Sequence, residues 1–222
     1  MNLEDLRACA ERALVDRSVY ARVHEPITAY YRFLALLSEG LELELNDLRC
    51  LEIGTYQGSS AAHLAASGAT VVTIDVNPDA ARLARALAVA QNLRITPITA
   101  NSGFVLGDPV EAAKIRALAP YDILYIDGDH TFNSAYGDYT HFWPLVREGG
   151  VIVFDDIELD MAGDEMRVFW DRVVDPKVKL NALHETGFGA AIRGRVPPPP
   201  WEAVITDVTR EILGRARPAP TG

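Results

Sequence analysis

Apolar and polar positions change their period several times along this chain, and each change marks a predicted element. Apolar residues three and four positions apart predict helices over 3–15, 27–37, 59–66, 80–91, 110–119, 135–146, 165–174 and 201–213. Short apolar runs predict strands over 49–53, 71–76, 95–99, 121–126, 151–154, 178–183 and 187–192, with a turn expected over 148–150. Strands that alternate with helices are typical of parallel βαβ units. The expected fold is a doubly wound, Rossmann-like α/β domain with a mostly parallel seven-stranded sheet and helices on both faces.

The chain length limits the number of domains. The 222 residues suffice for one well-buried domain and are too few for two ordinary ones. We expect a helical lid or subunit interface over 1–45, the main domain over 46–214, and a disordered tail over 215–222. The stiff proline run at 197–200 precedes the last predicted helix.

Charge and composition exclude several classes of partner. The formal net charge is −10, which argues against general binding to nucleic acid or to anionic membranes, because both need a basic surface. No apolar run approaches the about eighteen residues needed to span a bilayer, and the first residues lack the pattern of a signal peptide. With only two cysteines, a disulfide framework is not expected, and we predict a cytoplasmic protein.

A glycine turn follows the first predicted strand. Gly54 and Gly58 allow a tight turn that a ligand can approach closely. The carboxylate of Glu52 before this turn suits a ligand that carries an ammonium and a sulfonium group. The alternative interpretation is an ordinary strand-to-helix turn.

Polar residues also end the second and third strands. Asp75 stands where an acidic side chain accepts hydrogen bonds from ribose hydroxyls, although it could instead cap the next helix. Asn101 and Ser102 stand where small polar groups reach an adenine edge. Ligands of open parallel sheets bind beyond these strand ends.

A group of acidic residues follows the fourth and fifth strands. Asp127, Asp129 and His130 come after one strand, and Asp155 and Asp156 come after the next. We expect these two strands to be neighbours, so that the groups converge at one edge of the same cleft. Crowded carboxylates repel one another unless a cation or a proton neutralises them, and oxygen ligands without cysteines select Mg²⁺, Mn²⁺ or Ca²⁺. The alternative is helix capping and solvated acids, which we favour for Asp129. His130 is a candidate general base beside a metal-bound hydroxyl; otherwise it is a hydrogen-bonded loop histidine.

The glycine turn, Asp75 and the strand order resemble the class I S-adenosylmethionine (SAM) methyltransferases over roughly residues 50–157. By this resemblance, the SAM site is lined by Gly54, Tyr56, Ser59, Asp75, Asn101 and Ser102.

The run Ile126-Asp127-Gly128-Asp129-His130 and the later Phe154-Asp155-Asp156-Ile157 narrow the resemblance. They are similar to the metal-dependent sugar O-methyltransferases of the macrocin and mycinamicin type and to the cephalosporin-hydroxylase-like group. The resemblance implies that Asp127, Asp155 and Asp156 hold Mg²⁺ or Mn²⁺ and that His130 is the base. It also implies an acceptor hydroxyl on a sugar or oligosaccharide, such as a methylmannose polysaccharide precursor.

Other interpretations stay open. Catechol and caffeoyl-CoA O-methyltransferases share the layout but have a lysine at the position of His130 and an asparagine at that of Asp156. A catechol-type or other small-molecule O-methyltransferase, and a non-catalytic SAM-binding protein, are the alternatives. A hydroxylase is disfavoured because the chain has no His-x-Asp facial triad. Related enzymes are often oligomers, so we expect a homo-oligomer, most simply a dimer.

Overall fold

The computed structural model describes residues 48–66, 68–159, 163–179 and 186–194. The helices predicted over 3–15, 27–37 and 201–213, the segment 1–45 and the tail 215–222 lie outside these residues. Among the described residues, no helix is both long and apolar enough to cross a membrane.

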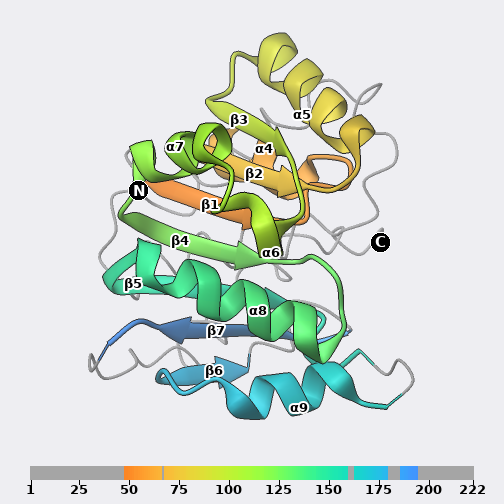
Figure 1. Ribbon diagram of the computed structural model, residues 1–222, viewed down its shortest axis with the longest axis vertical. Helices are drawn as coiled ribbons and strands as arrows, with labels where there is room; N and C mark the ends of the chain where they lie inside the picture. The colour runs from red at the N-terminus through yellow and green to blue at the C-terminus, as the bar shows by residue number, and fades with distance from the viewer. Residues whose placement is uncertain (1–47, 67, 160–162, 180–185, 195–222) are drawn as a thin grey trace, which may run out of the picture.

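The described residues form one seven-stranded sheet in the order β3-β2-β1-β4-β5-β7-β6 (Figure 1). The strands are β1 (Arg49–Ile53), β2 (Thr70–Asp75), β3 (Ile95–Thr99), β4 (Tyr121–Ile126), β5 (Val146–Asp155), β6 (Lys177–Lys179) and β7 (Phe188–Ile192). Strands β1 to β5 pair in parallel, and β7 runs antiparallel to both of its neighbours. The predicted mostly parallel, seven-stranded sheet is confirmed.

Helices connect the strands and cover the sheet (Figure 1). They are α4 (Ser59–Ala66), α5 (Pro78–Gln91), α6 (Ser102–Val105), α7 (Pro109–Leu118), α8 (Phe132–Phe142) and α9 (Glu165–Arg172), with a 3₁₀ turn, η2 (Trp143–Leu145). Several begin at side-chain caps that the sequence carries, for example Asn77 before α5 and Asp108 before α7. Proline follows each of these caps, where its missing N–H costs no helical hydrogen bond.

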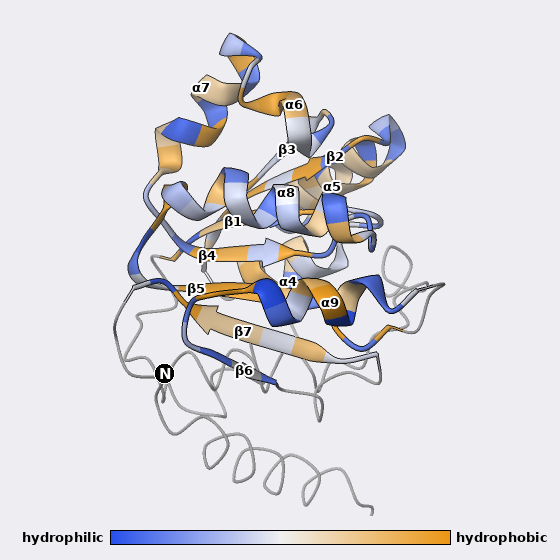
Figure 2. Cartoon of the chain, turned by 60° about the horizontal axis from the view of Figure 1, so that its bottom comes forward, coloured by the Kyte–Doolittle hydropathy of each residue, from blue (hydrophilic) through white to orange (hydrophobic). Residues whose placement is uncertain are grey.

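Strand β4 is buried along its whole length, as a strand covered on both faces should be. Figure 2 shows that β4 and β5 are largely apolar, whereas β6 and parts of the outer helices carry hydrophilic residues. The strand order reverses between β1 and β4, which are adjacent and parallel. Ligands of such sheets bind beyond the carboxyl ends of the strands at this point, and the candidate site lies there.

Two predictions about individual elements are wrong, and one short helix was not predicted. The turn expected over 148–150 is part of β5, which starts at Val146 and shifts register against β4 while Gly149 adopts φ +70°. The glycines therefore belong to a strand irregularity. Helix α8 begins at Phe132 rather than Ala135, because the Thr131 side chain caps it, and it ends at Phe142. The short helix α6 was not predicted, because four residues carry no helical period.

Candidate active site

The turn after β1 has the conformation that its glycines allow. Gly54 and Gly58 have φ values of +94° and +78°, and between them Tyr56 adopts φ +43° with most of its side chain exposed. A Cβ atom placed on Gly54 would lie 1.8 Å from the carbonyl oxygen of Asp127. The donor turn, as we call residues 54–58, therefore contacts the backbone of the loop that carries the acidic residues.

Asp75 supports the donor turn directly. Its Oδ2 accepts hydrogen bonds from the backbone N–H groups of Thr55 at 3.0 Å and Tyr56 at 2.9 Å. Its Oδ1 accepts from the N–H of Asn77 at 2.8 Å, at the start of α5. The side chain thus holds the turn and also assists the next helix. Contact with ribose hydroxyls stays a prediction.

Glu52 lies beneath the donor turn, not at its surface. The side chain is fully buried, and its two oxygens accept hydrogen bonds from the hydroxyls of Ser60 and Thr73. Burial raises the pKa of the Glu52 carboxyl to about 8, although both hydroxyl contacts oppose the rise. Ligands do not reach a side chain with no exposed surface. This placement therefore argues against the expected contact between the Glu52 carboxylate and a cationic ligand.

The remaining predicted donor-site residues lie at the ends of α4 and α6. Asn101 caps α6 by accepting a hydrogen bond from the N–H of Gly103 at 2.9 Å. Ser102 hydrogen-bonds to the buried carboxyl of Asp138 on α8. At the first residue of α4, the buried Oγ of Ser59 has no hydrogen-bond partner among the described residues.

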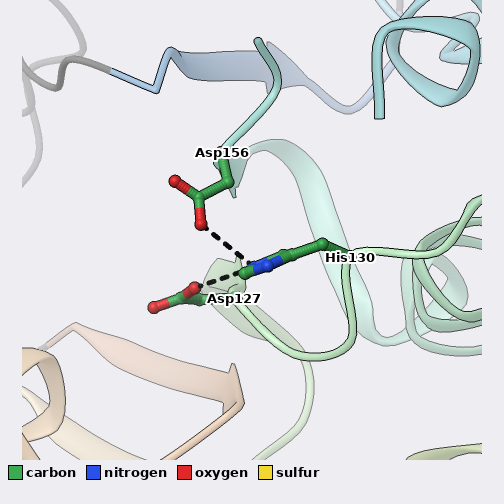
Figure 3. A group of neighbouring side chains, drawn as sticks. All are labelled: Asp127, His130 and Asp156. Atoms are coloured by element: carbon green, nitrogen blue, oxygen red, sulfur yellow. Dashed lines mark ion pairs between the residues drawn. The ribbon is translucent and has the colours of Figure 1, made fainter. Parts of the chain in front are cut away.

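Three acidic and basic groups converge beyond β4 and β5 (Figure 3). His130 Nε2 lies 3.5 Å from Asp127 Oδ1 and 3.2 Å from Asp156 Oδ2. One ligand atom from each residue lies within 4.8 Å of the others. We call Asp127, His130 and Asp156 the acidic cluster. The sequence prediction that the ends of these two strands meet is confirmed, because β4 and β5 are paired in parallel.

The acidic cluster makes His130 more basic. A hydrogen bond with Asp127 raises the pKa of the imidazole above its ordinary value, and the charges of Asp156 and Asp127 add to the effect, whereas burial opposes it. All three side chains are partly exposed, between 16% and 26%. The side chains thus reach the surface in part, whereas the Nε2 atom of His130 lies buried between the two carboxylates.

Asp155 faces a different neighbour. Its Oδ2 accepts a hydrogen bond from the Tyr125 hydroxyl at 3.0 Å, its Oδ1 accepts from the N–H of Asp156 at 2.9 Å, and the residue is only 3% exposed. Asp156 leaves the strand with φ +57°, and its Oδ1 accepts from the Thr186 hydroxyl. The structure thus brings Asp156 to His130 and does not include Asp155 in the three-residue cluster. Its role as a metal ligand stays a prediction.

Asp129 has the structural contacts expected of a capping residue. Its Oδ2 accepts hydrogen bonds from Thr131 Oγ1 at 3.1 Å and from Ser134 Oγ at 2.8 Å, at the start of α8. Asp138 and Thr186 are neighbours of the site that were not predicted from the sequence. A polar residue among the buried positions of α8 was a usable signal for Asp138, whereas no local pattern points to Thr186.

Solved structures of known proteins share the fold of this chain. The O-methyltransferase from Bacillus cereus in complex with SAH matches with 21% identity, 84% of this chain, 91% of that chain and a TM-score of 0.58. The O-methyltransferase TomG from Streptomyces achromogenes in complex with SAM matches with 20% identity, 87% of this chain, 92% of that chain and a TM-score of 0.55. At such identities these likenesses show the fold, which is a Rossmann-like methyltransferase fold.

The sequence itself also matches. Residues 51–157 match the family described as a methyltransferase domain. The catechol O-methyltransferase of Mycobacterium tuberculosis is 32% identical over 129 residues, which are 57% of this chain and 54% of that protein. The chain thus spans little more than half the length of this curated relative.

Proposed function

We propose that this chain is a SAM-dependent O-methyltransferase that transfers a methyl group to a hydroxyl of a small molecule or oligosaccharide. One observation carries the proposal. The donor turn and the acidic cluster share one sheet edge, where Gly54 approaches the carbonyl of Asp127 too closely for any side chain. A methyl donor on the first and an acceptor on the second would meet at this boundary.

The donor turn supports SAM as the donor. Asp75 holds the N–H groups of Thr55 and Tyr56 at the end of β2, where ribose hydroxyls bind in this fold. The unpartnered Oγ of Ser59 offers a further hydrogen bond at the start of α4. Both solved relatives described above hold SAM or its product SAH.

The acidic cluster suits a divalent metal ion. Its carboxylates are oxygen ligands of the type that Mg²⁺ and Mn²⁺ prefer. Asp127 and Asp156 would hold the ion, and we retain Asp155 as a proposed third acid. When bound, such an ion offsets the two negative charges and favours ionisation of a nearby acceptor hydroxyl.

His130 is the proposed general base. Its Nε2 points to the carboxylates of Asp127 and Asp156 (Figure 3), so it is placed to take the proton of an acceptor hydroxyl in the same space. The hydroxyl oxygen forms a bond to the methyl carbon while the carbon–sulfur bond breaks. The proton ends on Nε2, and the donor leaves as the neutral thioether SAH.

The acceptor we favour is a sugar or oligosaccharide hydroxyl, for example on a methylmannose polysaccharide precursor. The support is the pair His130 and Asp156, which matches the pattern of the sugar enzymes and departs from the lysine and asparagine of catechol enzymes. A catechol is the second candidate, because the Mycobacterium tuberculosis relative is named a catechol O-methyltransferase.

A transfer assay tests both candidates. The chain is incubated with methyl-labelled SAM and Mg²⁺ and with a panel of mono- and oligosaccharides or of catechols, and products are detected by mass spectrometry. We expect labelled sugars and loss of label with EDTA. Label on catechols alone would move the proposal to the second candidate. SAM binding with no EDTA-sensitive transfer to either panel would contradict it and support a non-catalytic binding protein.

A further inference from the structure

A chain of buried hydrogen bonds runs beneath the donor turn. Glu52 on β1 accepts from the hydroxyls of Ser60 on α4 and Thr73 on β2, and it has no exposed surface. The hydroxyl of Thr73 in turn lies 2.5 Å from that of Thr55, inside the turn. Glu52 therefore joins two secondary-structure elements to the turn without reaching the space above it.

Thr55 is the last residue in this series of hydrogen bonds, and its backbone also makes the contacts that define the donor turn. Its N–H donates to Asp75 at 3.0 Å, and its carbonyl accepts from the N–H of Gly58 at 2.6 Å. The residue is 2% exposed. A shift of the Thr55 side chain would therefore move both contacts that define the turn.

The turn needs such support because it contains a strained residue. Tyr56 adopts φ +43°, in the left-handed region that non-glycine residues rarely occupy. Backbone of this kind persists only where the surrounding structure determines it. Asp75 holds Tyr56 from the outer side, and the Thr55–Thr73–Glu52 chain holds its neighbour from the inner side.

We propose that Glu52 is a positioning residue for the donor: a buried carboxyl group that holds the donor turn through Thr73 and Thr55 and makes no contact with SAM. The inference rests on the proposed function and refines it. It replaces the expectation that this carboxylate binds the positive charge of the donor.

The hydrogen bonds to Thr73 and Thr55 also indicate which substitution preserves the contacts of Glu52. The ionised carboxylate accepts from both Ser60 and Thr73, as described above. With the pKa raised to about 8, the carboxyl is neutral at pH 7, and its O–H then donates to one of these hydroxyls; if that is Thr73, the Thr73 hydroxyl donates to Thr55 instead. A glutamine amide donates in the same way. The other groups whose charges act on this carboxyl are Asp127 and Asp75, and the thiol of buried Cys50 is held neutral beside it because burial raises its pKa.

Calorimetric titration of SAM, without acceptor or metal, tests the proposal. We expect Glu52→Gln to keep the dissociation constant within about twofold, whereas Glu52→Leu and Thr73→Val weaken it about tenfold through lost hydrogen bonds. Asp175→Leu is the matched control. Asp175 is also a buried acid, and it accepts hydrogen bonds from the side chains of Tyr139 and Trp143 and from one backbone N–H group, all of them outside the donor turn. This variant should lose thermal stability and keep the SAM affinity.

A pH series adds a readout that a purely structural role would not change. The wild-type SAM affinity should fall as pH rises through about 8, and that of Glu52→Gln should not. If Glu52→Gln weakens SAM as strongly as Glu52→Leu, the carboxylate binds the donor directly and the proposal is overturned. Unchanged SAM affinity in Thr73→Val would also overturn the proposal. This variant provides the test if Glu52→Leu does not fold. Absence of SAM binding by the wild-type chain would instead contradict the proposed function itself.

Discussion

The donor half and the acidic half of this site satisfy their polar groups in different ways. In the donor half, Asp75 and Glu52 each accept hydrogen bonds from neutral groups that belong to the turn or its supports. In the acidic half, two carboxylates approach the same nitrogen of His130. The first half is held by directional hydrogen bonds, and the second is held by charge.

This difference has a consequence for ligand binding. A turn fixed by neutral hydrogen bonds keeps its shape whether or not its ligand is present. A group of two carboxylates and one imidazole changes its balance of charge whenever a proton or a cation binds. We therefore expect the donor half to be preorganised and the acidic half to respond to pH and metal. The following predictions test that contrast, from the largest effect to the smallest.

The contact between the two halves is the most sensitive position. Gly54→Ala would place a methyl group 1.8 Å from the Asp127 carbonyl oxygen at φ +94°, so we expect a loss of about 4 kcal/mol or more in the free energy of unfolding. SAM and Mn²⁺ binding should weaken together, as measured by denaturation and calorimetry. Gly137→Ala in α8 meets no atom within 4 Å and should stabilise the protein by about 0.5–1 kcal/mol. Equal stability of both variants would contradict the geometry.

His130 separates chemistry from donor binding. His130→Ala should reduce methyl transfer by about 10²–10⁴-fold, the usual contribution of a general base, while the dissociation constant of SAM stays unchanged. His141→Ala is the control, because His141 is an exposed histidine near the end of α8, the helix that follows His130. Retained turnover in His130→Ala would remove this residue from the mechanism. Weakened SAM binding would show that the two halves are not independent.

Asp156 and Asp129 separate a cation ligand from a helix cap. Asp156→Asn should weaken Mn²⁺ binding by about tenfold or more, as followed by electron paramagnetic resonance. Asp129→Asn should leave Mn²⁺ binding unchanged and slightly destabilise α8, because its carboxylate accepts from Thr131 and Ser134. Asp155→Asn refines the test. Strong loss of Mn²⁺ binding would make Asp155 a ligand, and no loss would limit its role to the Tyr125 contact.

The extent to which sequence predicts this molecule also differs between its parts. Strands β1, β3 and β4 have the predicted bounds. For the buried strands β1 and β4, the apolar run ends at a glycine or an aspartate that a buried strand excludes. The meeting of the acids after β4 and β5 follows from parallel topology alone. The choice of Asp156 over Asp155 does not, because it depends on a left-handed backbone at Asp156 and on Thr186 from a distant segment. The burial of Glu52 was missed because its packing partners come from α4 and β2.

The smallest predicted effect concerns the protonation of Glu52 in the donor half. The folded-state pKa of Glu52 is about 8, against 4.5 for the unperturbed carboxyl. Because the folded value is raised, the associated stability is fully present below pH 4.5 and is lost as pH rises through 8. Between pH 7 and pH 8 the free energy of unfolding should therefore fall by about 1 kcal/mol more for the wild type than for Glu52→Gln. Urea denaturation of both proteins across this range measures the difference. Parallel pH profiles would mean that Glu52 is already ionised when folded, and the donor half would then be held by charge, as the acidic half is.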